Sequence, residues 1–351
     1  MRRLLPLLTI AALLFVRTSA RADNLLLDRF GDYLDALRTQ AVIPGLAVAL
    51  VGQRDILWER PFGHQNIERS VAARTDTPFH LDGLTQVFTS ALVLRCVEEG
   101  RLSLDDRVGR FAPSSPDSNA TLRELLTHTS GSPDAPVFAY RPERLDALTP
   151  AVRACTGDSF RETLANLFDR LAMRDSVPGP DVVRLAPPSE GIPGDEVARY
   201  RSTLERLATP YAVDSAGRAS SSLDGATTLT PFGGLVSTVR DVAQFDLALR
   251  NGLLLRPETV AASWSAPVGP DGHRLPHGVG WFVQTYNGET IVWQMGMNEN
   301  ASSSLIVTVP GRGLTLVLLA NSDRLVKPFA LKAGDLTASP FGRLFLELFV
   351  R

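Results

Sequence analysis

The positions of serine and lysine in this chain exclude one common hydrolytic site. A serine followed three residues later by a lysine can pair a nucleophile with its base, because residues i and i+3 share one face of a helix. No serine of the chain has a lysine at that spacing, and the two lysines, Lys327 and Lys332, lie close to the C-terminus. The Gly-x-Ser-x-Gly nucleophile turn is also absent. A serine-based reaction would therefore need another arrangement.

Histidine and cysteine spacings give no support for a metal or other cofactor. None of the five histidines pairs with another at His-Glu-x-x-His spacing, and Cys96 and Cys155 form no Cys-x-x-Cys unit. The two cysteines could form a disulfide in an exported chain. Both fall in predicted helical segments that look core-facing, so we expect buried free thiols.

The segment from Phe79 to Gly100 predicts a buried helix. Apolar residues recur at helical spacing at Leu84, Val87, Phe88, Ala91 and Leu92. Asp82 is a plausible N-cap and Gly100 lies where a C-cap is expected, so the helix should begin near Gly83.

This segment resembles the first catalytic motif of the serine β-lactamase and penicillin-binding-protein superfamily, especially its class C β-lactamase, DD-peptidase and esterase branch. There Phe-x-x-Gly-Ser-x-x-Lys opens the helix. Aligned on Phe79 and on Phe88 with its neighbour Thr89, the serine position holds Gly83 and the lysine position holds Gln86. Glycine has no nucleophile and glutamine has no useful basicity.

Further segments extend the resemblance over most of the chain. They are Ile43 to Val51, Glu98 to Asp106, Leu125 to Gly131 (Leu-Leu-Thr-His-Thr-Ser-Gly), Gly233 to Asp241, and Pro310 to Asn321. The resemblance implies an α/β (α+β) fold of the DD-peptidase/β-lactamase type, with an antiparallel sheet flanked by helices and an inserted helical domain. We expect a sheet subdomain of residues 23–80 and 210–351 and a helical subdomain of residues 81–209.

The other two motifs implied by the resemblance are also changed. The Tyr-x-Asn motif aligns with Tyr140-Arg141-Pro142, which keeps the tyrosine and replaces the asparagine with proline. On the strand expected to carry Lys-Thr-Gly or His-x-Gly, the basic residue becomes Gln294 while Gly296 remains. The alternative is that Tyr140 is an ordinary loop aromatic.

One feature of the family's site needs no particular side chain. The resemblance implies an oxyanion hole made by the backbone amides of Gly83 and Met297, which could still bind a carbonyl-bearing ligand. His277, just ahead of a strand expected to enter the cleft, is a candidate ligand contact.

The N-terminus has the pattern of a secretory signal. Two arginines, an apolar run and small residues follow one another in residues 1–22, so we expect cleavage after Ala22 and a periplasmic protein without a stable membrane anchor. An uncleaved signal anchor is the alternative. A net charge of −2 gives no reason to expect nucleic acid or an anionic membrane as partner.

Loss at all three motifs predicts a catalytically inactive, exported homologue. We expect it to bind a cell-wall peptide, a β-lactam-like molecule or another protein. The alternative is an active hydrolase of amide or ester bonds with a non-standard arrangement, in which Tyr140 activates water or a substrate nucleophile.

Overall fold

A computed structural model describes residues 25–131, 136–184 and 191–351 of the protein. The predicted signal peptide, residues 1–22, lies outside the described residues. Within the described ranges, no helix is both long enough and apolar enough to cross a membrane.

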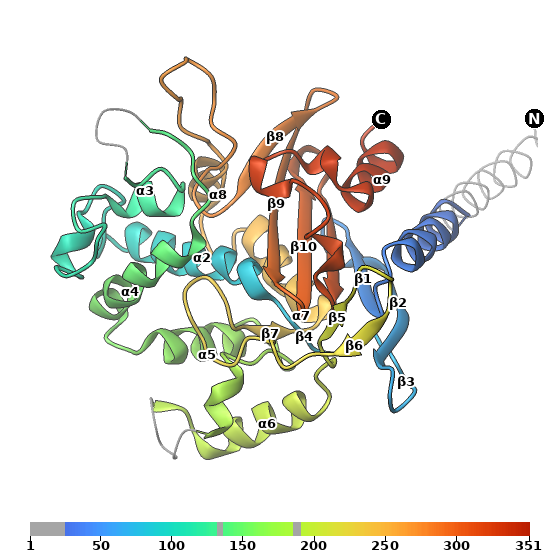
Figure 1. Ribbon diagram of the computed structural model, residues 1–351. Helices are drawn as coiled ribbons and strands as arrows, with labels where there is room; N and C mark the ends of the chain where they lie inside the picture. The colour runs from blue at the N-terminus through green and yellow to red at the C-terminus, as the bar shows by residue number, and fades with distance from the viewer. Residues whose placement is uncertain (1–24, 132–135, 185–190) are drawn as a thin grey trace, which may run out of the picture.

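A seven-stranded antiparallel sheet forms the centre of the molecule (Figure 1). Its order is β3-β2-β1-β11-β10-β9-β8, so strands from the two ends of the chain pair where β1 meets β11. The strands are β1 (Gly45–Val51), β2 (Ile56–Asn66), β3 (Val71–Ala72), β8 (Phe282–Tyr286), β9 (Glu289–Asn298), β10 (Ser302–Val309) and β11 (Leu314–Ala320). This confirms the predicted fold class.

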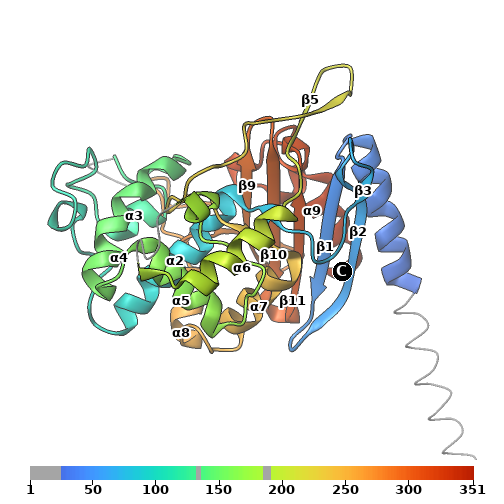
Figure 2. The ribbon, with the colours of Figure 1, turned by 90° about the horizontal axis from the view of Figure 1, so that it is seen from below.

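Both faces of the sheet are covered, which explains why its central strands are apolar almost throughout (Figure 2). One face packs against the helix at residues 25–40 and against α9 (Pro340–Phe349), with Phe30, Trp293 and Phe341 in the shared core. The other face packs against α7 (Val239–Arg250) and the helical region, where Val317 and Phe245 are buried together.

The helical region and its connections occupy the middle of the chain. Its helices are α2 (Thr85–Glu98), α3 (Leu122–Leu126), α4 (Thr149–Thr156), α5 (Phe160–Arg170) and α6 (Gly194–Glu205), and α8 (Pro257–Ser263) follows α7. Two small sheets pair β4 (Phe79–His80) with β7 (Val236–Ser237), and β5 (Tyr211–Val213) with β6 (Ala219–Ser221).

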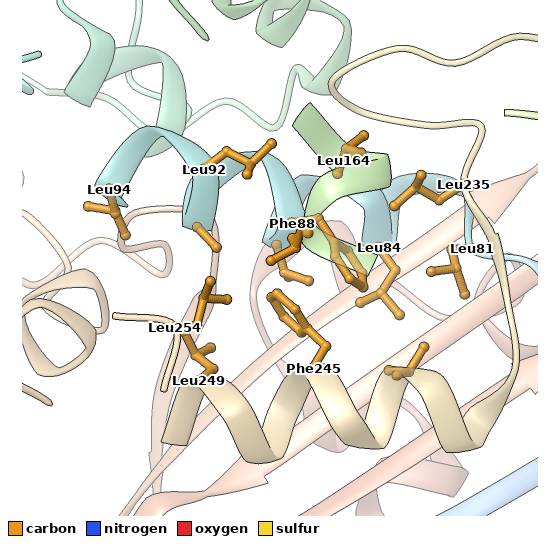
Figure 3. Close-up of a cluster of buried hydrophobic side chains, with 14 of the residues drawn as sticks. Leu81, Leu84, Phe88, Leu92, Leu94, Leu164, Leu235, Phe245, Leu249 and Leu254 are labelled. Atoms are coloured by element: carbon orange, nitrogen blue, oxygen red, sulfur yellow. The ribbon is translucent and has the colours of Figure 1, made fainter. Parts of the chain in front are cut away.

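Helix α2 lies in the apolar core between α5 and α7 (Figure 3). Phe88 packs against Phe245 with ring centroids 4.1 Å apart and the rings tilted by 32°, and Leu164 of α5 packs in the same cluster. Gly100 has a φ of +69°, which is the left-handed conformation expected just after a helix. This burial fixes the start of α2 against the sheet.

The predicted N-cap at Asp82 is wrong. Asp82 opens a short 3-10 turn, η1 (Asp82–Leu84), and α2 begins at Thr85, with no side-chain cap at either start. Asp82 has a φ of +49°, whereas an N-cap residue is extended. Its carboxylate instead accepts a hydrogen bond from Ser302 Oγ at 2.8 Å.

The predicted free thiols are also wrong, because Cys96 and Cys155 form a disulfide. Both side chains are buried, as expected. Helices α2 and α4 pack against each other, which brings the two Cα atoms to 6.1 Å. That distance lies within the range a disulfide requires.

Candidate functional site

A cavity of about 320 Å³ opens where η1, the end of β9 and the loop at residues 226–234 meet. It is lined by Asp82, Gly83, Tyr140, Pro142, Ala226, Thr227, Thr228, Thr230, Phe232, Gly233, Gly234, Met295, Met297, Asn298 and Lys332. Four predicted site residues, Gly83, Tyr140, Pro142 and Met297, therefore line the same cavity. The structure brings three separate motifs together here.

Gln86 is the centre of a hydrogen-bond network behind this wall. Its Nε2 donates to the Tyr140 hydroxyl at 2.8 Å and to Gly83 O at 3.0 Å. Its Oε1 lies 3.0 Å from His128 Nε2. Because Arg141 N donates to His128 Nδ1, the proton of this imidazole is on Nε2 and points at Gln86. Both amide protons and the amide oxygen of Gln86 are thus engaged.

Tyr140 lines the cavity and accepts a hydrogen bond from Gln86. Its ring packs on Phe282 with centroids 5.5 Å apart, and its hydroxyl proton has no acceptor among the residues that the structure describes. Burial raises the pKa of Tyr140 to about 12. At neutral pH the phenol stays protonated.

Gln294 is paired with His277 in a second, deeper arrangement. Gln294 Nε2 donates to Gly280 O at 3.1 Å and lies 3.3 Å from His277 Nε2, while its Oε1 accepts from Met295 N. His277 Nδ1 donates to Gly278 O at 2.7 Å, so its Nε2 is the acceptor. Both side chains are fully buried and neither lines the cavity. A ligand in the cavity would reach His277 only after a rearrangement.

The two glutamine–histidine pairs touch and are electrically neutral. The rings of His128 and His277 lie 4.6 Å apart, edge to face. Burial lowers the pKa of His128 to about 3 and that of His277 well below its ordinary value. In the family's pattern, this region would hold a serine, a lysine and a second cation. Here it holds four neutral side chains.

The turn at Gly83 and the strand at Gly296 approach each other closely. A Cβ on Gly83 would lie 2.9 Å from Met295 O, and one on Gly296 would lie 2.0 Å from Leu81 O and 2.8 Å from Gly83 N. Gly296 is therefore required by the close backbone approach. This approach places the predicted amide donors, Gly83 and Met297, on the same cavity.

Asp82 is a site residue that the sequence reading missed. Its side chain is 3% exposed, its Oδ2 is bonded to Ser302, and its Oδ1 has no hydrogen-bond partner within the described residues. Burial raises its pKa to about 7, against the opposing effects of Ser302 and the Asn298 backbone. Asp82 occupies the glycine position of the first motif, and its positive φ is the conformation that glycine favours. The aspartate at a glycine position of the motif could have identified Asp82 as a site residue from the sequence.

Comparisons with known proteins identify the family of the chain. The Beta-lactamase family model matches residues 30–335. Penicillin-binding protein 4 of Amycolatopsis lactamdurans is 27% identical over 374 residues, covering 90% of this chain and 87% of that protein. Protein flp of Staphylococcus aureus is 26% identical over 134 residues, covering 36% of this chain, and the match spans only 27% of flp.

Solved structures share the fold. The octameric penicillin-binding protein homologue from Pyrococcus abyssi superposes with a TM-score of 0.73 at 18% identity, covering 92% of this chain and 77% of that one. The class C β-lactamase from Rhodobacter sphaeroides gives a TM-score of 0.67 at 18% identity, covering 92% and 98%. Because the family model matches most of its length, the chain belongs to the β-lactamase family.

Proposed function

We propose that this protein is a catalytically inactive, exported member of the β-lactamase family that binds a small carbonyl-bearing ligand in the cavity beside Gly83. The observation that carries the proposal is the hydrogen bonding of the Gln86 side chain. It stands at the position of the catalytic base, and its hydrogen bonds are spent on His128, Tyr140 and Gly83 O. Residues 1–22 support the export part of the proposal through their signal-like pattern.

The expected loss of activity is large. Where a nucleophile and its base act as a unit, removing either costs on the order of 10⁶ in kcat. Both positions are changed here, at Gly83 and Gln86, and the third-motif cation is replaced by Gln294. His128, with a pKa of about 3, is a very weak base, and the Tyr140 phenol, with a pKa of about 12, stays protonated at neutral pH.

Ligand binding could persist because its donors do not depend on the lost side chains. The amides of Gly83 and Met297 and the hydroxyl of Tyr140 all belong to cavity-lining residues. Together they suit a carbonyl oxygen of a peptide or a β-lactam-like molecule.

The alternative reaction through Tyr140 fits this geometry less well. A tyrosine acts as a base only when its phenolate is accessible. The Tyr140 oxygen already accepts a hydrogen bond from neutral Gln86, and no cation replaces the missing lysine beside it among its described contacts. Tyr140 is better suited to donate a hydrogen bond than to remove a proton.

The experiment compares the native protein with a Gly83→Ser/Gln86→Lys/Gln294→His variant, using fluorescent penicillin, a fluorophosphonate and nitrocefin. We expect no covalent labelling and no turnover by the native protein. A serine Cβ would lie 2.9 Å from Met295 O, so the backbone there must shift, and Gly83→Ala/Gln86→Lys/Gln294→His is the matched control for this crowding without a nucleophile. Labelling or turnover by the native protein would contradict the proposed inactivity.

Binding is tested separately by NMR. We expect the Gly83 and Met297 amide resonances to shift on titration with β-lactams or D-Ala-D-Ala peptides. If neither resonance moves with any of these ligands, the amides do not form the binding site proposed here.

A further inference from the structure

A second cavity, of about 300 Å³, lies where α2, α4 and α5 meet. It shares no lining residue with the cavity of the candidate site. Three of its lining residues are arginines, Arg95, Arg101 and Arg170, and two are acidic, Glu99 and Asp158. The arginines outnumber the carboxylates, so the cavity has an excess of positive charge.

Glu99 satisfies two of the three arginines only in part. Arg95 Nε lies 3.1 Å from Glu99 Oε1, and Arg101 Nη2 lies 3.3 Å from Glu99 Oε2. Arg101 also donates through Nη1 to Cys155 O at 2.9 Å. A guanidinium has five N–H donors. Both arginines therefore keep donors that have no acceptor among the described residues.

Arg170 has no carboxylate of its own. Within the described ranges its side chain forms no ion pair and no hydrogen bond. Desolvation lowers the pKa of Arg170, the charge of Arg95 lowers it further, and Glu99 opposes both effects. The Arg170 charge thus lies near those of Arg95 and Glu99 without being compensated. The carboxylate of Asp158 contacts Asn166 Nδ2 at 3.5 Å and does not pair with an arginine of the described chain.

The helices that carry these arginines cannot separate to relieve the repulsion. The Cys96–Cys155 disulfide joins α2 to α4 beside the cavity, and the bond from Arg101 to Cys155 O joins the same two segments. Helix α5 packs against α4 in turn. Like charges held near each other repel, and an anion bound between them would turn that repulsion into attraction.

We propose that this cavity binds a phosphate group, either as the free ion or on a small phosphate monoester, with Arg95 and Arg170 as its main ligands. Guanidinium groups match phosphate oxygens in geometry and donate charge-assisted hydrogen bonds to them. A dianion also compensates the excess of positive charge better than a single carboxylate does. The site is separate from the cavity beside Gly83, so it does not depend on the proposed inactivity.

The test follows the Thr163 and Asn166 amide resonances by NMR, since both residues line this cavity. Inorganic phosphate, glycerol 3-phosphate and acetate are titrated separately at pH 8 and constant ionic strength. We expect saturable shifts with the two phosphate compounds and at least about tenfold weaker binding of acetate. Tighter binding of glycerol 3-phosphate assigns the site to a monoester, and tighter or equal binding of phosphate assigns it to the free ion.

Arg170→Gln should weaken phosphate binding about tenfold, as expected for the loss of a charge-assisted hydrogen bond. Arg153→Gln is the matched control, because Arg153 is also an exposed arginine in the last turn of a helix but does not line this cavity. Each substitution removes one positive charge, so non-specific attraction falls equally in both. The control should retain its affinity. Glu99→Gln should strengthen binding, because it releases the donors of Arg95 and Arg101.

Three results would overturn the inference. They are shifts that do not saturate or that acetate reproduces, equal effects of Arg170→Gln and Arg153→Gln, and weaker phosphate binding by Glu99→Gln. Melting temperatures show that each variant is folded. Turnover of nitrocefin by the native protein would refute the proposed function instead, so the two failures are distinguishable.

Discussion

At the scale of single residues, Gln86 stands where the motif has lysine, and its side chain completes a buried hydrogen-bond network. A lysine there would need a charged or strongly polar environment, whereas a glutamine offers two donors and one acceptor. His128, Tyr140 and Gly83 O use all of them. The sequence alone showed that the base was lost. It could not show that the new side chain had become structurally important.

Replacing Gln86 with leucine should therefore destabilise the fold. The change leaves three buried polar groups without their partner, and each such group costs about 1–3 kcal/mol. We expect the free energy of unfolding to fall by at least about 3 kcal/mol, measured by urea denaturation. Gln53→Leu, at an exposed position, is the matched control and should change stability by less than about 0.5 kcal/mol. Equal effects of the two substitutions would contradict the role assigned to the network.

At the scale of elements, the site depends on how α2 is fixed. Its start contacts β9 through η1, and its far end is joined to α4 by the Cys96–Cys155 disulfide. Helical periodicity predicted that both cysteines face a core, which is correct. Periodicity does not determine which two helices pack together, so the pairing of the cysteines could not be predicted from it.

Removing the disulfide should lower stability through the unfolded state. The cross-link joins residues 59 apart in sequence, and a loop of that size corresponds to roughly 4 kcal/mol in the chain-entropy account. We expect a Cys96→Ala/Cys155→Ala variant to lose 2–4 kcal/mol in urea unfolding. Reductant should destabilise the native protein by a similar amount and leave the double variant unchanged. If reductant affects both proteins equally, its effect does not come from this disulfide.

At the scale of the whole molecule, buried titratable groups set opposing trends of stability with pH. Burial raises the pKa of Asp82 to about 7 and of Asp241 to about 6, so the folded protein holds these protons where the unfolded chain has lost them. Their contribution to stability falls as pH rises from about 4 to 7. His80 and His128, with pKa values of about 4 and 3, act oppositely and favour folding as pH rises toward 6.5.

The difference in unfolding free energy between Asp82→Asn and the native protein isolates the pH dependence that Asp82 contributes. An asparagine does not ionise, so the variant should gain stability relative to the native protein as pH rises from 5 to 8. The expected gain is roughly 2–3 kcal/mol, with most of it between pH 5 and 7. Urea unfolding at four pH values measures it. A difference that stays constant with pH would mean that Asp82 does not titrate in this window.

The sequence by itself determined the fold class and the absence of a serine followed three residues later by a lysine. These follow from local patterns and from their order along the chain. Tertiary structure decided the partners of the side chains. Gln86 meets Tyr140 across 54 residues, and Asp82 meets Ser302 across 220 residues. Hydrogen bonds depend on distance and direction in space, so the neutral network and the half-satisfied carboxylate of Asp82 emerge only when the strands and helices have packed.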